Sequence, residues 1–108
     1  MDERIKTLAK QLVHHSCRLQ KGEKVLISCH GVHPIPLVKA LIKEIYAVEA
    51  IPFVELSTNS IERELLLGAT AEQQKLMAEV DSMRMKQMDA YIGVRGEDNL
   101  AEESDVPG

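Results

Sequence analysis

The feature that most constrains the fold is an alternation of short apolar runs with longer segments of helical spacing. Apolar residues recur every three or four positions in residues 4–19, 37–49 and 71–88, as in amphipathic helices. Short apolar runs that are typical of strands lie between them, at residues 25–27, 51–56 and 90–94. Strands that alternate with helical crossovers form parallel sheets. The sequence therefore predicts a three-layer α/β fold: a small parallel sheet of about three strands, in order 2-1-3, flanked by helices.

The length of the chain limits it to one domain. Its 108 residues and 12.1 kDa leave no room for a second independent core. We assign residues 1–96 to a single α/β domain and residues 97–108 to a polar acidic tail or linker in loop conformation. A three-stranded sheet is small, and nothing is predicted after its third strand. We therefore expect the chain to be the front of a longer polypeptide.

Two helix starts are marked by capping-box spacing. Asn59 is followed by Glu62, and Thr70 is followed by Gln73, so that a side chain and the backbone satisfy each other's free donors. A short helix is expected to run over residues 60–67 and to stop at Gly68. A second is expected to begin after Thr70.

The charge balance argues against a nucleic-acid partner. Acidic residues number 17 and basic residues 13, for a net charge of -4, and the basic residues do not gather into one run. Tyr46, Phe53 and Tyr91 are too few to form a base-stacking platform. No run of about 18 apolar residues is present, and the first residues are charged where a signal peptide is apolar. We expect a cytoplasmic protein that binds neither nucleic acid nor membrane.

The cysteines and histidines are the candidate metal ligands and nucleophiles. Cys29, His30 and His33 follow the first strand, but a tetrahedral zinc site needs four donors. The further donors lack the spacing of a ligand pair; they are His14, His15 and Cys17. A nucleophilic Cys29 would need an oxyanion hole and an orienting carboxylate, which the sequence does not identify. We therefore expect reduced thiols, no metal site and no catalytic residue.

A ligand crevice in this fold class lies at the carboxyl ends of the strands. The residues that would line it are His30, His33, Ser57, Thr58 and Arg95. The loop after the first strand has one glycine and two prolines, whereas phosphate-binding loops need closely spaced glycines. A dinucleotide or P-loop nucleotide site is therefore disfavoured.

Two further groups of residues have ordinary structural interpretations. Met83, Met85 and Met88 lie on a helix expected to cover the sheet, so we expect them to fill core gaps rather than to form a binding surface. The acidic residues of the tail lack the ligand spacing of a calcium loop and are expected to be solvated.

Several segments, taken in order, resemble a known family. They are Leu19-Gln-Lys-Gly-Glu-Lys-Val-Leu-Ile, Pro36-Leu-Val-Lys-Ala-Leu, Ala50-Ile-Pro, the stretch from Glu72 to Met77, and Met88-Asp-Ala-Tyr-Ile. Together they resemble the amino-terminal segment of the thermophilic metallo-aminopeptidases, the aminopeptidase T and aminopeptidase S type. Before the second strand, where a glycine would usually be expected, this chain has Val48-Glu49-Ala50.

The resemblance implies a cytoplasmic enzyme that removes amino-terminal residues from peptides with two divalent metal ions, of the zinc or cobalt class. It also implies a dimer. The resemblance covers about the first quarter of such enzymes, whose metal ligands belong to the carboxyl-terminal half, so no ligand is carried over. We expect this chain alone to be an inactive, non-catalytic domain. The alternatives are a free-standing α/β module that binds a small ligand, and a structural or dimerisation domain.

Overall fold

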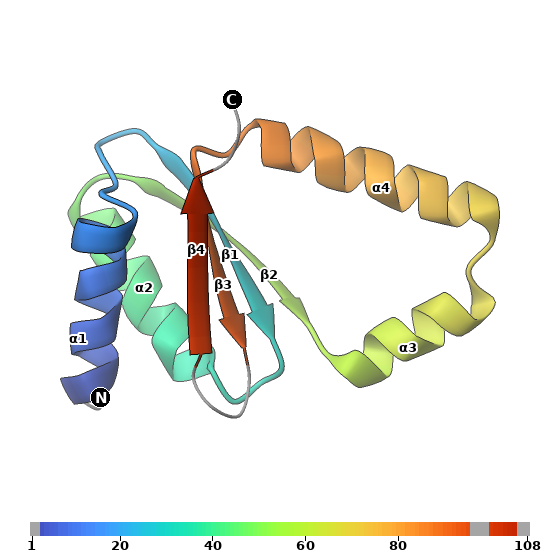
Figure 1. The fold of residues 1–108 in the computed structure, drawn as a ribbon, viewed down its shortest axis with the longest axis horizontal. Helices are drawn as coiled ribbons and strands as arrows, with labels where there is room; N and C mark the ends of the chain where they lie inside the picture. Colours follow the sequence, from blue (N-terminus) through green and yellow to red (C-terminus); the bar gives the residue numbers. More distant parts are fainter. Residues whose placement is uncertain (1–2, 96–99, 106–108) are drawn as a thin grey trace.

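The structure is a computed structural model that describes residues 3–95 and 100–105. Its elements, in chain order, are α1 (Glu3–Gln11), a short π-helix η1 (Leu12–Ser16), β1 (Lys24–His30), α2 (Ile35–Ala47), β2 (Ile51–Ser57), α3 (Asn59–Gly68), α4 (Ala71–Lys86), β3 (Ala90–Arg95) and β4 (Leu100–Asp105) (Figure 1). Within the described residues, no helix is both long and apolar enough to span a membrane.

The sheet has the predicted parallel core. Strands β2, β1 and β3 are parallel and adjacent in that order, which confirms the α/β class and the order 2-1-3. In the middle strand, Leu26 pairs with Phe53 of β2 on one side and with Tyr91 of β3 on the other. This register places corresponding positions of the three strands on the same face of the sheet.

A fourth strand extends the sheet beyond the prediction. β4 pairs antiparallel with β3, so the loop predicted for residues 97–108 is wrong for residues 100–105. The edge of β3 offers unpaired backbone N–H and C=O groups, and an extended segment pairs with them through its own backbone, without needing apolar side chains. A polar sequence without alternation therefore gives no signal for such a strand. The other tail residues, 97–99 and 106–108, lie outside the described residues.

One face of the sheet carries the hydrophobic core. Helices α1 and α2 and the π-helix η1 cover this face, and they pack against every second residue of β1 and β3. Val25 and Ile27 of β1, Ile92 of β3, and Leu41 and Ile45 of α2 are completely buried there. The core therefore lies between one helical layer and one face of the sheet.

Helices α3 and α4 leave the sheet instead of covering its second face. Helix α3 runs away from the sheet and α4 runs back, so that the two form a helical arm, residues 59–86. Only the carboxyl end of α4 lies near the sheet (Figure 1). No residue of either helix is buried. The expectation that Met83 packs in the core is therefore wrong, since its side chain is 59% exposed. Met88, beside the sheet, is buried as expected, and Met85 is half-buried.

The start of α3 differs by one residue from the capping-box prediction. Thr58, with extended backbone, is the N-cap, and its hydroxyl oxygen accepts a hydrogen bond of 3.3 Å from the N–H of Ile61. Asn59, the expected cap, is the first residue inside the helix. At the start of α4, the prediction is confirmed: the Thr70 hydroxyl accepts from the N–H of Gln73 at 3.1 Å.

Candidate functional site

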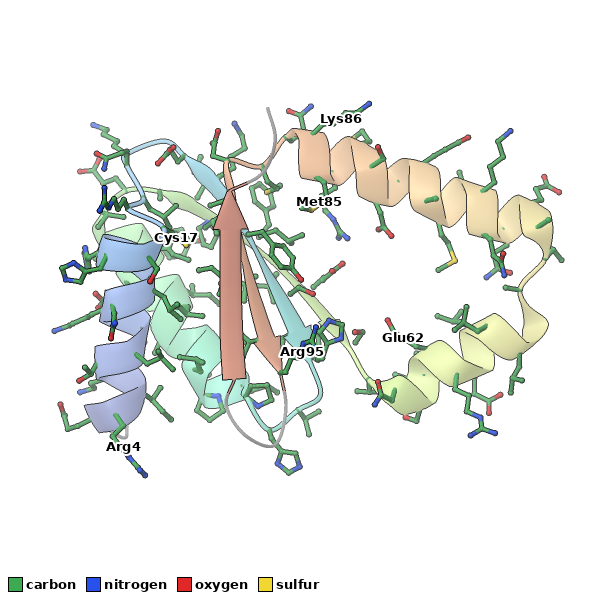
Figure 2. All side chains as sticks on the ribbon, viewed as in Figure 1. Arg4, Cys17, Glu62, Met85, Lys86 and Arg95 are labelled. Carbon is green, nitrogen blue, oxygen red and sulfur yellow. The ribbon has the colours of Figure 1, made fainter. Side chains whose placement is uncertain are left out.

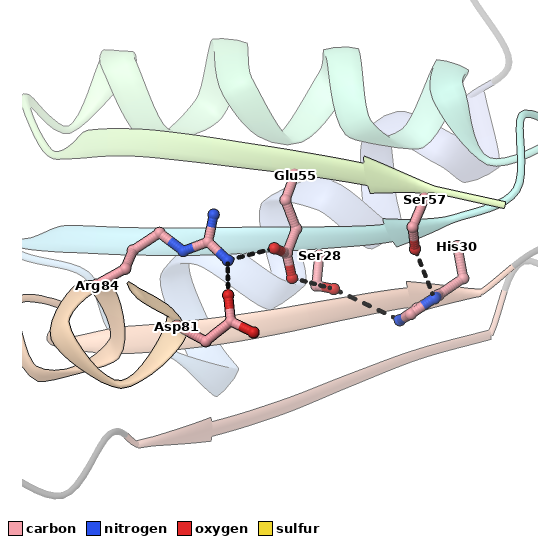
Figure 3. A network of polar contacts seen from close by, with 6 residues as sticks. All are labelled: Ser28, His30, Glu55, Ser57, Asp81 and Arg84. Atoms are coloured by element: carbon pink, nitrogen blue, oxygen red, sulfur yellow. Dashed lines mark hydrogen bonds and ion pairs between the residues drawn. The ribbon is translucent and has the colours of Figure 1, made fainter. Parts of the chain in front are cut away.

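A row of polar side chains crosses the sheet on the face opposite the core. Ser28 and His30 of β1 alternate with core residues, and Glu55 and Ser57 of β2 lie beside them in the register. The parallel register pairs Ser28 with Glu55 and His30 with Ser57. Because side chains two residues apart on a strand share a face, these two register pairs lie next to each other on the same face of the sheet. Figure 3 shows them in contact near the carboxyl ends of the strands.

Hydrogen bonds connect these four residues in one series. The Ser28 hydroxyl donates to Oε1 of Glu55 at 3.1 Å and lies 3.5 Å from Nε2 of His30. Since the single Ser28 proton is already used, this long contact with Ser28 needs a proton on Nε2. In a neutral imidazole, Nδ1 is then an acceptor, and the Ser57 hydroxyl donates to it at 3.2 Å. For a neutral His30, these contacts fit the Nε2–H tautomer.

Helix α4 joins this row through its last turn. Nη2 of Arg84 forms an ion pair with Oε2 of Glu55 and a second contact of 3.1 Å with Oδ1 of Asp81 (Figure 3). We call these six residues the polar network: Ser28, His30, Glu55, Ser57, Asp81 and Arg84. Because Ser57 directly precedes the N-cap of α3, the network contacts the chain at both ends of the arm.

The polar network suits anchoring better than nucleophilic catalysis. Ser28 is only 2% exposed, and its hydroxyl is committed to Glu55. A nucleophile must reach a substrate, and a general base must receive its proton in the same pose. The Glu55–Arg84 ion pair instead holds the end of α4 against the sheet.

Cys29 is unsuited to nucleophilic chemistry. It faces the core, on the opposite side of β1 from His30, and its thiol donates to the carbonyl oxygen of Gly31 at 3.3 Å. Burial raises the pKa of this thiol above its ordinary value, which disfavours the reactive thiolate. The two residues therefore form no cysteine–histidine pair.

The structure gathers most of the predicted crevice residues at one edge of the sheet. His30 and Ser57 are hydrogen-bonded, Thr58 follows as the cap of α3, and Arg95 is the β3 register partner of His30 (Figure 2). His33 lies apart from them, exposed in the segment between β1 and α2. That these residues bind a ligand stays a prediction.

Four members of the polar network were missed by the sequence reasoning: Ser28, Glu55, Asp81 and Arg84. A signal for two of them exists, because Ser28 and Glu55 are polar residues inside otherwise apolar strands, each two positions before a predicted crevice residue. Asp81 and Arg84 give no such signal, since charged residues are ordinary on a helix surface. Their role depends on where the arm returns to the sheet.

The described residues do not fit the two metal ions that the resemblance implies. Among them, no group of three histidine, cysteine or carboxylate side chains is arranged to hold a metal. Cys29 faces the core, both ring nitrogens of His30 are engaged by serines, and His14 pairs with Glu44 at 3.1 Å. Metal ligation would have to break these contacts.

Comparison with known proteins places this fold in a family. The wild-type AmpT structure from Thermus thermophilus is similar, with a TM-score of 0.64 and 21% sequence identity over 87% of this chain. The match spans 25% of the AmpT chain, and at this identity it shows the fold alone. No curated protein matches the chain. A model of the thermophilic metalloprotease family, M29, matches residues 1–107. The chain therefore belongs to the M29 family of thermophilic metalloproteases.

Proposed function

We propose that this chain is the amino-terminal, non-catalytic domain of a two-metal aminopeptidase, which removes amino-terminal residues from peptides. The observation that carries the proposal is the match to a metalloprotease family over residues 1–107, in a chain whose described residues hold no metal-ligand group. The divalent ions, of the zinc or cobalt class, are then held by other parts of the polypeptide. The chain spans a quarter of the length of AmpT, which leaves room for those parts.

In this proposal, the domain supports the enzyme without touching the reacting atoms. The sheet and the helices α1 and α2 form a packed body, which can wall one side of the peptide cleft. In this proposal, the full-length enzyme binds the peptide substrate. We place that enzyme in the cytoplasm, as a homo-oligomer. Neither nucleic acid nor membrane is part of this function.

A structural or dimerisation role is a second candidate, and a specific observation favours it. The helical arm exposes large apolar side chains on both of its helices, among them Ile61, Leu66, Leu67 and Leu76, each at least 60% exposed. Large apolar side chains exposed to this degree are typical of interaction sites when they lie together. The two roles are compatible, because a domain that walls a cleft can also join subunits.

A titration tests whether the chain is catalytic by itself. Zinc and cobalt are titrated into the chain by calorimetry, and turnover of an aminoacyl chromogenic substrate is followed in parallel, with a full-length M29 enzyme as the positive control. We expect neither stoichiometric binding nor turnover by the chain. Tight binding with turnover that His30→Ala abolishes would contradict the proposal and make the His30 region a metal site.

A chimera tests whether the chain works as the proposed domain. This chain replaces the matching segment of AmpT, and metal content and turnover are measured. We expect a metal-loaded chimera that retains turnover with an altered KM, because the cleft wall changes while the metal-bearing part does not. A folded, metal-loaded chimera with no turnover at any substrate concentration would contradict the proposal.

A further inference from the structure

Helix α4 carries an apolar stripe that faces solvent. Leu76, Val80 and Met83 are 60%, 49% and 59% exposed. Their spacings of four and three residues place them on one face of the helix. These three residues form the α4 stripe.

The α4 stripe borders the side of α4 that already has neighbours. Met77, Ala78 and Asp81 point to the inner angle of the arm, where they line a hollow of about 230 Å³ together with residues of α3. Arg84 points to the sheet through Glu55. Met77 lies three residues before Val80 and Arg84 four residues after it, so their row borders the stripe on one side. Neither α3 nor the sheet covers it.

Opposite charges flank the two ends of the stripe. Glu72, in the first turn of α4, lies four residues before Leu76, and Lys86, in the last turn, lies three residues after Met83. Both therefore fall in the same row beside the stripe. The two are 14 positions apart, about 21 Å along the helix, so they cannot pair within one copy. Among the described residues, neither has an ion-pair partner, and Lys86 points outward at the end of α4 (Figure 2).

We propose that the α4 stripe binds the α4 stripe of a second copy of this chain, with the two helices antiparallel about a two-fold axis. The midpoint of Leu76 and Met83 lies between positions 79 and 80, and the midpoint of Glu72 and Lys86 is position 79. One axis therefore brings Leu76 next to Met83 of the second copy and Glu72 next to Lys86 of the second copy. A two-fold interface needs this kind of self-complementary surface.

The charge of the arm is also compatible with self-association. Residues 59–86 contain five acidic and four basic side chains, whereas the whole chain has a net charge of -4. Two arms therefore approach each other with little net repulsion. The inference rests on the homo-oligomer of the proposed function and names its surface.

Glu79 provides an independent check on the register of the pair. It lies in the same row as Glu72 and Lys86, at the proposed midpoint, so the two-fold axis brings it close to its own copy. Two like charges facing each other oppose association. Removal of this charge should therefore strengthen a dimer that has this register.

Charge reversal with rescue tests the proposal. The mass of the chain is measured by sedimentation velocity over about a hundredfold range of concentration, for the natural chain, E72K, K86E and the double variant. We expect a concentration-dependent dimer. Each single reversal should weaken it about tenfold, because the symmetric interface contains the pair twice, and the double variant should restore it.

The same variants separate association from effects inside the helix. Each reversal also places a charge that is unfavourable with the helix dipole, which lowers the stability of α4. These two losses of helix stability add in the double variant. A double variant that associates more weakly than either single one would overturn the proposal. So would a monomer at every concentration, which would point to other parts of a longer polypeptide as the cover of the arm.

A further variant keeps both end charges. E79Q should associate about threefold more tightly than the natural chain, and equal or weaker association would overturn the proposed register. Mass and turnover are separate readouts. A monomeric, inactive chain contradicts this inference alone, whereas turnover by the chain contradicts the proposed function alone.

Discussion

At the scale of single residues, Glu49 has a conformation that glycine adopts more easily. Its φ is 62°, in the left-handed region, at the turn between α2 and β2. This is the place where the family resemblance leads one to expect glycine. The turn itself is well bonded, since the N–H of Glu49 donates to Tyr46 at 2.9 Å and its carbonyl oxygen accepts from Gly22 at 2.9 Å. The chain therefore keeps this turn although Glu49 adopts a strained left-handed conformation.

We predict that Glu49→Gly is more stable than Glu49→Ala. Both variants lose the exposed ion pair with Lys21, but only glycine adopts the left-handed conformation without strain. The strain relieved, about 1–2 kcal/mol, exceeds the extra backbone entropy of glycine, so the difference should be about 1 kcal/mol. Urea unfolding of the two variants measures it. Equal midpoints would show that Glu49 is unstrained.

A second residue-scale prediction concerns Cys29 and pH. Burial raises the pKa of its thiol above the ordinary value of 9.0, so the folded chain holds this proton more tightly than the unfolded chain. The resulting stability is fully present below pH 9 and is lost as pH rises through the folded pKa, by at most about 1.4 kcal/mol per pH unit.

The measurement is urea unfolding of the natural chain and of Cys29→Ala at neutral pH and at alkaline pH. We expect the advantage of the natural chain over the alanine variant to shrink at alkaline pH, because alanine has no proton to lose. An advantage that stays constant across this range would contradict the prediction. Cys17, which is only half-buried, serves as the control position through Cys17→Ala.

At the scale of elements, the start of α3 shows how local backbone decides between neighbouring caps. We predict that Thr58→Ala weakens the first turn of α3 by about 1 kcal/mol, whereas Asn59→Ala has little effect. Because α3 has no buried residue, the loss should appear as about fivefold faster amide exchange within α3 rather than as a lower global stability. The reverse order of the two variants would restore Asn59 as the cap.

The return of α4 to the sheet depends on one ion pair. We predict that Glu55→Gln and Arg84→Met are coupled, with an interaction energy of about 1 kcal/mol in a double-mutant cycle. The coupling is modest because both side chains are about one-third exposed and Nε of Arg84 is buried without a hydrogen-bond partner among the described residues.

Unfolding free energies of the two single variants and the double variant give the coupling. Asp81→Asn is the matched control, because Asp81 contacts Arg84 from within α4. Amides near the end of α4 should exchange faster in Arg84→Met. Additive effects of Glu55→Gln and Arg84→Met would show that the ion pair does not hold α4.

At the scale of the whole molecule, the chain divides into a packed body and an arm that depends on its ends. Among the described residues, every completely buried side chain lies in the body, which comprises the sheet, α1, η1, α2 and the segments that join them, and none lies in the arm. Local opening needs little free energy where few apolar contacts are broken. Stability should therefore be distributed unevenly along the chain.

Hydrogen exchange tests this division. We predict that amides of β1 exchange only by global unfolding, whereas amides of α3 and α4 exchange faster by at least about a hundredfold. If α4 pairs with a second copy, α4 should gain protection as the concentration rises, and β1 should not. Uniform protection across body and arm would contradict the division.

The sequence by itself determined the elements whose burial is strong and periodic. The apolar runs that contain Val25 and Ile92 predict strands, and the stripe that contains Leu41 and Ile45 predicts a helix. Each conformation places the apolar side chains of its pattern on a buried face. Tertiary structure decided the rest. The polar pattern of residues 100–105 does not predict β4, which forms by backbone pairing with the edge of β3. The Glu55–Arg84 ion pair depends on the path of an arm whose side chains remain exposed, and exposed side chains do not select one path over another.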